Sequence, residues 1–185
     1  MPISNGKYYP EAALGNVFIG STAAAGVAFP ISTGTAATFG LWNTCTTKNA
    51  VLLRLTVGYT SGTIALGTIG IANTYGGFAV SAEGNITAFT NGALGTTIRN
   101  AQLGSGKAST MRFTPSAATV VANNAALWTG CSIESATAGL GIFRCDYDFD
   151  GGAILPPGQF AYLCGSVAQT GVFTCSLTWA EVDIT

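Results

Sequence analysis

The sequence contains no histidine and very little charge of either sign. Without histidine, Ser-His-Asp and Cys-His nucleophile pairs cannot form, and the commonest zinc ligand is missing. Charged residues make up 8% of the chain, against about 25% in an ordinary globular protein. The seven basic residues are scattered and the net charge is −1, whereas proteins that bind nucleic acid cluster their Lys and Arg. We therefore expect neither an enzyme nor a nucleic-acid-binding protein.

Long apolar runs are also missing. No segment approaches the roughly 20 apolar residues that span a membrane, so we expect no membrane partner. Residues 1–10 have no basic region followed by an apolar core, which predicts the absence of a secretory signal. The five cysteines are odd in number and lack the paired short spacings of zinc sites. We expect a chain made in a reducing cytoplasm, with free and mostly buried thiols.

The clearest positive signal is an alternation of apolar and small polar residues near the C-terminus, over residues 160–179. A period of two places alternate side chains on one buried face of a strand. Folding this segment about Gln169 predicts an antiparallel hairpin in which Phe160 lies opposite Trp179. The same register places Cys164 opposite Cys175, and it leaves open a disulfide between them.

Strand-like runs separated by Gly, Asn, Ser and Pro occupy the chain from Val17 onward. In the central run, residues 51–57, we expect Val51, Leu53, Leu55 and Val57 to share one face. Sustained helical periodicity is missing. We predict an all-β fold, an antiparallel β-sandwich of the jelly-roll type formed by residues 17–185. Residues 1–16, broken by Pro and Gly, are predicted to form an extended N-terminal arm.

One acidic motif resembles part of a metal-binding loop. Residues 146–151 read Asp-Tyr-Asp-Phe-Asp-Gly, which matches the opening of a calcium loop. That loop also needs an acidic twelfth residue, and here the position is Pro157. The favoured interpretation is a strand end, with Tyr147 and Phe149 turned inward and the Asp side chains in water. We therefore predict no metal site.

Paired carboxylates could support an enzymatic function. A glycosidase needs two carboxylates about 5–10 Å apart, but nothing in the local sequence pairs Glu83, Glu134 and Glu181; for Glu181 a hydrogen bond near a strand end is the better explanation. We predict no catalytic residue and no cofactor.

Exposed tryptophans can stack on sugars. Trp179 is expected in the core, which leaves Trp42 and Trp128 as a candidate sugar platform.

Four segments resemble stretches that recur in structural proteins of tailed bacteriophages: residues 39–43, 49–62, 152–159 and 177–182. The resemblance as a whole extends over about half of the chain, in its centre and at its C-terminus, at the level of pattern. The family that they resemble includes small jelly-roll decoration, or cement, proteins, often trimeric, which bind the outside of the capsid shell. The resemblance implies a fold and a role but carries over no catalytic residues.

Taken together, these patterns predict a capsid decoration protein in the virion, whose partners are the major capsid protein and two further copies of itself. The arm residues Lys7, Tyr8 and Tyr9 are the candidate capsid contacts, because aromatic residues are enriched in interfaces. Two alternatives remain: a glycan-binding module of a phage fibre or adhesin, and a capsid shell protein in its own right.

Overall fold

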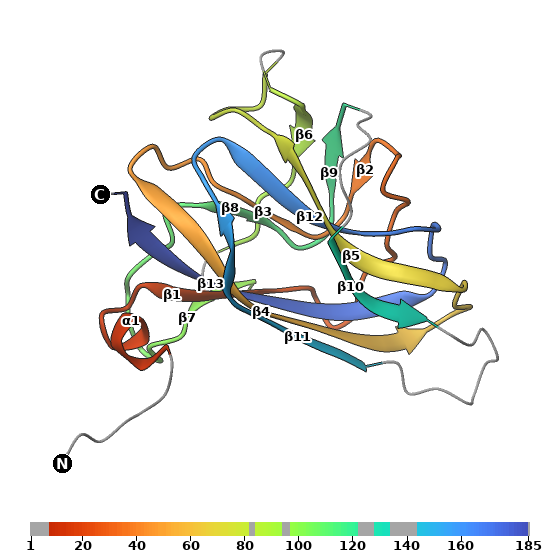
Figure 1. Ribbon diagram of the computed structural model, residues 1–185, viewed down its shortest axis with the longest axis horizontal. Helices are drawn as coiled ribbons and strands as arrows, with labels where there is room; N and C mark the ends of the chain where they lie inside the picture. Colours follow the sequence, from red (N-terminus) through yellow and green to blue (C-terminus); the bar gives the residue numbers. More distant parts are fainter. Residues whose placement is uncertain (1–7, 82–83, 94–96, 122–127, 134–143, 185) are drawn as a thin grey trace.

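Antiparallel β-strands form nearly all the regular structure of the computed structural model (Figure 1). The structure describes residues 8–81, 84–93, 97–121, 128–133 and 144–184. Two five-stranded sheets pack face to face, and a three-stranded sheet lies against the second of them. The predicted all-β antiparallel sandwich is confirmed.

The first sheet has the strand order β11-β4-β13-β1-β7. Its members are β1 (Val17–Ser21), β4 (Lys48–Ser61), β7 (Ile98–Asn100), β11 (Arg144–Leu155) and β13 (Val172–Asp183). The second sheet has the order β10-β5-β12-β3-β8. It contains β3 (Gly40–Trp42), β5 (Gly67–Tyr75), β8 (Arg112–Thr114), β10 (Trp128–Ile133) and β12 (Gln159–Gly165). The third sheet, in the order β2-β9-β6, contains β2 (Ala36–Ala37), β6 (Ile86–Phe89) and β9 (Ala118–Val120).

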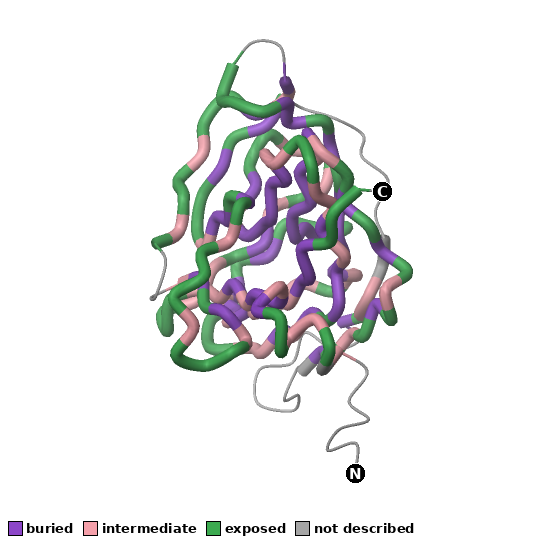
Figure 2. The backbone as a smooth tube through the Cα atoms, turned by 90° about the vertical axis from the view of Figure 1, so that its left-hand side faces the viewer, coloured by how far each residue is buried: buried purple, intermediate pink, exposed green. Residues whose placement is uncertain are grey.

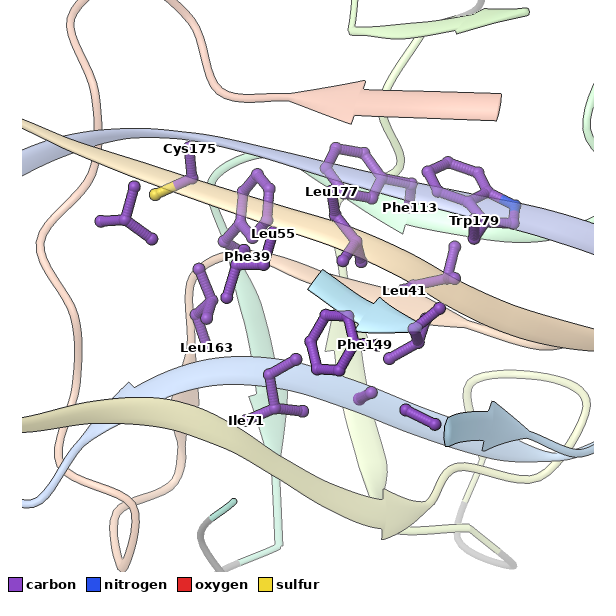
Figure 3. Close-up of a cluster of buried hydrophobic side chains, with 14 of the residues drawn as sticks. Phe39, Leu41, Leu55, Ile71, Phe113, Phe149, Leu163, Cys175, Leu177 and Trp179 are labelled. Carbon is purple, nitrogen blue, oxygen red and sulfur yellow. The ribbon is translucent and has the colours of Figure 1, made fainter. Parts of the chain in front are cut away.

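The main core fills the space between the first two sheets. Leu55 and Trp179 enter it from the first sheet, and Ile71 and Leu163 enter it from the second (Figure 3). These strands alternate because each presents one face to the core and the other outward. Buried backbone accordingly runs through the middle of the molecule, with exposed segments around it (Figure 2).

A second core lies between the second and third sheets. Trp42, Phe160 and Tyr162 fill it together with Ile86 and Cys164. Strand β12 is therefore covered on both faces, and its residues Phe160–Gly165 are all buried. A strand that is buried on both faces needs apolar or small residues at every position, which β12 has.

The predicted C-terminal hairpin is wrong, because β12 and β13 lie in different sheets. Phe160 is the register partner of Trp42 and Thr74, while Trp179 is the partner of Phe18 and Leu52. The segment after β12 crosses from one sheet to the other instead of turning back. Alternation in β12 is real, but its aromatic residues face the third sheet and not β13.

The N-terminal segment is not extended where the structure describes it. Residues Tyr9–Ala13 form a short helix, α1, with a proline in its first turn. Tyr8 and Ala12 pack on the outer face of the first sheet, against Val17, Leu53 and Ala180. Glu181 N–H donates to the Asn16 carbonyl at 2.8 Å. This part of the predicted arm is thus folded onto the sandwich; residues 1–7 lie outside the described part.

Candidate functional site

The outer face of the first sheet, beyond the part that α1 covers, is coated with hydroxyl groups. We call it the hydroxyl face; its members are Ser21, Thr22, Thr56, Thr174 and Ser176. Thr56, Thr174 and Ser176 point outward because they alternate with core residues such as Val57 and Cys175. Ser21 is the register partner of Ser176, and Thr22 follows directly after β1. A shallow hollow of about 380 Å³ lies among these strands, lined by residues 21–24, 56–58 and 174–176.

The hydroxyl groups are held in place by short hydrogen bonds. Thr56 Oγ1 and Ser176 Oγ lie 2.8 Å apart across the β4–β13 pair. Thr22 Oγ1 accepts a hydrogen bond from the Cys175 amide at 3.1 Å. The result is a fixed, neutral surface that can both donate and accept hydrogen bonds.

An ion pair between β4 and β11 lies beside the hydroxyl face. Arg54 Nη2 lies 3.2 Å from Asp146 Oδ1, with the two side chains 56% and 30% exposed. Such an exposed pair contributes less than about 1 kcal/mol to stability. The two charges of this pair neutralise each other locally, while Asp148 and Asp150 of the same strand are also exposed.

The acidic motif of β11 is a strand and not a loop. Asp146, Asp148 and Asp150 are exposed, whereas Cys145 and Phe149 are buried. Asp148 Oδ1 accepts hydrogen bonds from the Asp150 amide at 2.9 Å and from Tyr8 Oη at 2.8 Å. The strand interpretation is confirmed. Within the described ranges, no group of three or more His, Cys, Asp or Glu residues is placed to hold a metal ion.

Of the predicted capsid contacts, the structure describes the side chain of Tyr8 alone; Lys7 and the Tyr9 side chain lie outside the described part. Tyr8 is half-buried where it packs against Val17, Leu53 and Ala180, and its hydroxyl donates to Asp148. Burial, followed by the hydrogen bond with Asp148 and the negative charge of Asp148, raises the pKa of Tyr8. Tyr8 therefore ties the N-terminal segment to its own sheet.

Glu181 is the one carboxylate of the glycosidase candidates that can be placed, since Glu83 and Glu134 lie outside the described residues. It is 3% exposed. Thr110 Oγ1 donates to it at 2.7 Å, and the Ser109 hydroxyl and the Thr110 amide also donate to it. These bonds fasten residues 109–110 to the C-terminal strand. The hydrogen-bond interpretation is confirmed, at a buried position.

The sugar platform predicted at Trp42 is wrong. Trp42 is fully buried, and its Nε1 donates to the Gly77 carbonyl at 2.8 Å. Its ring meets Phe89 edge to face at 5.2 Å, and the Arg112 guanidinium lies 5.3 Å from the ring centre. The prediction that Trp179 is a core residue is confirmed, as its ring stacks with Phe18 and Phe113. The side chain of Trp128 lies outside the described part.

Three of the five cysteines are free, and the disulfide that forms is not the one left open by the sequence. Cys131 of β10 and Cys145 of β11 form a disulfide between the first two sheets, with their Cα atoms 6.2 Å apart. Cys164 and Cys175 are free and buried in separate cores, so the disulfide left open between them is not formed. Sequence reasoning could not find the Cys131–Cys145 pair, because no local signal indicates that β10 and β11, the edge strands of two different sheets, lie next to each other.

The free thiols have different environments. Burial raises the pKa of Cys164 to about 12, and burial also raises the pKa of Cys175. Partial burial pushes the pKa of Cys45 upward, but hydrogen bonds with Thr47, Thr110 and Lys48 outweigh it and lower the pKa overall. Cys45 is therefore the most reactive of the free thiols.

Among the residues that the structure describes, no helix is both long enough and apolar enough to cross a bilayer. Comparisons with protein-family models, with curated proteins and with solved structures find no match to this chain.

Proposed function

We propose that this chain is a virion structural protein that decorates the outside of a capsid shell and stabilises contacts between capsomers. The observation that carries the proposal is the hydroxyl face, a group of serine and threonine side chains on the central strands of a sheet that are partly held by hydrogen bonds. The major capsid protein is its proposed partner, and the virion its proposed location.

The strand order supports a jelly roll. The strands β3, β4 and β5 fall in the second, first and second sheets, and β10 to β13 continue this alternation. Within the sheets, β11-β4-β13-β1 stands opposite β10-β5-β12-β3, while β7 and β8 extend one edge of each. Eight-stranded jelly rolls form many capsid and lectin domains, which favours a surface-binding role.

The chemistry of the hydroxyl face suits docking on a repeating shell. Neutral hydroxyls cost less to remove from water than charged groups, provided that they stay hydrogen-bonded. Serine and threonine side chains have little rotamer freedom to lose on binding. A face that is already rigid has a smaller ordering cost when it meets its partner.

We also propose that the protein acts as a homotrimer, because a closed symmetric oligomer suits a symmetric shell. Sedimentation equilibrium of the free protein, or counting copies in a reconstruction of the decorated particle, measures this state. Monomers in solution and single isolated copies on the shell would together remove the trimer from the proposal.

The decisive test is attachment to particles. Capsids purified without this chain are mixed with the protein, and bound protein is measured by co-sedimentation and electron microscopy. Ser176→Arg should weaken attachment by about tenfold or more, because it places an unpaired charge in the contact. The matched control is Thr119→Arg, at an exposed threonine on β9 of the third sheet, which should attach normally. Equal attachment of both variants would place the contact elsewhere.

The N-terminal segment is tested by two deletions. Removing residues 1–7 leaves the packing of Tyr8 and Ala12 intact, so weaker attachment would report a direct contact of those residues. Removing residues 1–16 also uncovers Val17, Leu53 and Ala180 and should lower the melting temperature. If the shorter deletion attaches normally, Lys7 is not a capsid contact.

A further inference from the structure

A groove of about 610 Å³ opens between the first two sheets, where edge strand β11 faces β5 and β12. It lies on the other side of the first sheet from the hydroxyl face. Its walls include the apolar residues Leu52 and Ile71 and the small residues Ala153 and Ala161. Because the small side chains do not fill the space between the sheets, the main core ends there in an open cleft of the size that small ligands occupy.

The inner face of the second sheet changes character as it enters this groove. Ile71 pairs with Leu163 inside the core; the next pair on the same face is Asn73 with Ala161, and the pair after that is Tyr75 with Gln159. Ile71 and Leu163 are buried, whereas Asn73 and Tyr75 are exposed and Gln159 is half-buried. The row therefore leaves the apolar core and reaches solvent at the groove, where polar side chains are accessible to a ligand.

Asn73 and Gln159 both line the groove. Within the described part of the chain, neither side chain has a hydrogen-bond partner. Each amide offers two N–H donors and one carbonyl acceptor. Two such groups on adjacent strands can bind a ligand group that donates and accepts at neighbouring atoms.

Tyr75 is not itself a lining residue, but it is the register partner of Gln159 and offers an aromatic surface at the end of the groove. Its ring is 47% exposed and lies against the backbone of Gly158, where a Cβ atom would come within 2.7 Å of the ring. Gly158 has φ +79°, a conformation that glycine adopts freely. Hydrogen bonds from the Gly76 amide to the Gly158 carbonyl, and from the Gly158 amide to Asn43, hold this turn in place.

We propose that this groove binds a neutral saccharide. A sugar ring has an apolar face that can stack on an aromatic ring, and a rim of hydroxyls that donate and accept hydrogen bonds as the two amides require. The lining residues carry no charged side chain, which argues against a phosphorylated or acidic ligand. The inference is independent of capsid attachment and uses a different site from the tryptophan platform.

The test uses the full chain and three neutral probes: maltose, cellobiose and N,N′-diacetylchitobiose. Ligand-observed NMR and calorimetric titration should detect at least one of them with a Kd of about 1 mM or tighter. Asn73→Ala, Gln159→Ala and Tyr75→Ala should each weaken binding by about tenfold, whereas Tyr75→Phe, which keeps the ring, should bind like the unmodified protein. The control is Gln102→Ala, an exposed glutamine outside the groove, which should change nothing.

Thermal melting of each variant shows whether the fold is retained, and the two amide variants keep the test decisive if Tyr75→Ala unfolds. Absence of binding for all three sugars overturns the proposal. Binding that all three groove variants leave unchanged also overturns it, because the sugar then sits elsewhere. Preference for the uncharged peptide acetyl-Gly-Ser-Gly-Ser-amide over every sugar would assign the groove to peptides and overturn it as well.

Discussion

At the scale of single residues, Tyr162 shows how the second core was filled. Its ring stacks on Phe160 at 5.3 Å and is almost completely buried. Its hydroxyl is buried without a hydrogen-bond partner among the described residues. A buried donor that is left unpaired costs about 1–3 kcal/mol. The ring therefore stabilises the fold while its hydroxyl opposes it.

Tyr162→Phe should consequently stabilise the protein. The substitution removes the unpaired hydroxyl and keeps the ring, so we expect the free energy of unfolding to rise by about 1 kcal/mol. Urea denaturation followed by fluorescence measures the change. Tyr59→Phe serves as the control, because the Tyr59 hydroxyl donates to the Gly62 carbonyl at 2.6 Å and its loss should not stabilise. A less stable Tyr162→Phe variant would mean that the hydroxyl has a partner.

At the scale of elements, a bulge in β4 redirects the strand. Thr178 pairs with Arg54 and Trp179 pairs with Leu52, which leaves Leu53 unpaired. The predicted face of Val51, Leu53, Leu55 and Val57 is therefore wrong: Leu55 and Val57 enter the main core, while Val51 and Leu53 pack beneath α1. A bulge reverses the alternation of a strand at the point where it occurs, and here it supplies the apolar patch on which α1 docks.

The disulfide is the covalent link between strands of opposite sheets, and it should contribute to stability. Cys131 and Cys145 are separated by 14 residues, and closing a loop of this length stabilises by about 3 kcal/mol. Reduction should therefore lower the melting temperature by several degrees, as differential scanning calorimetry with and without reductant can measure. A Cys131→Ser variant should not respond to reductant.

A thiol count checks the same link. Under denaturing conditions without reductant the protein should show three free thiols, corresponding to Cys45, Cys164 and Cys175. Five thiols in protein purified without reductant would contradict the disulfide.

At the scale of the whole molecule, the second sheet divides the interior into two cores and buries ionisable groups in both. Burial, with a smaller effect of neighbouring Cys164, raises the pKa of Tyr162 from 10.0 to about 12. Burial raises the pKa of Cys164 from 9.0 to about 12, and that of Cys175 also rises. The folded state therefore holds protons that the unfolded state releases in alkali.

This difference predicts a loss of stability at high pH. Below about pH 9 both states keep these protons and the stability is unaffected; as the pH rises from about 9 to about 12, the unfolded state loses them first. The free energy of unfolding should fall steadily over that window in urea titrations. The decline should be shallower in Tyr162→Phe, and a flat profile up to pH 11 would contradict the burial of all three groups.

Local sequence patterns were enough to predict the class of fold and which side chains of some individual strands face the core. Low charge, abundant Gly and Thr, and period-two alternation predict an antiparallel sandwich. The alternation also predicts which side of β11 faces the core. Cys145 and Phe149 alternate with Asp residues, and a carboxylate is stable only in water or beside a polar partner. Glu181 was correctly expected to be a hydrogen-bonded residue for a similar reason.

Which strands are neighbours could be learned only from the folded molecule. The alternation of Phe160, Tyr162 and Cys164 is the same whether that face meets β13 or a third sheet, so local pattern could not place it. The Cys131–Cys145 link, the bulge at Leu53 and the row of Asn73 and Tyr75 at the groove all depend on contacts between distant segments. Side-chain periodicity records that a face is covered; the identity of what covers it is set by long-range packing.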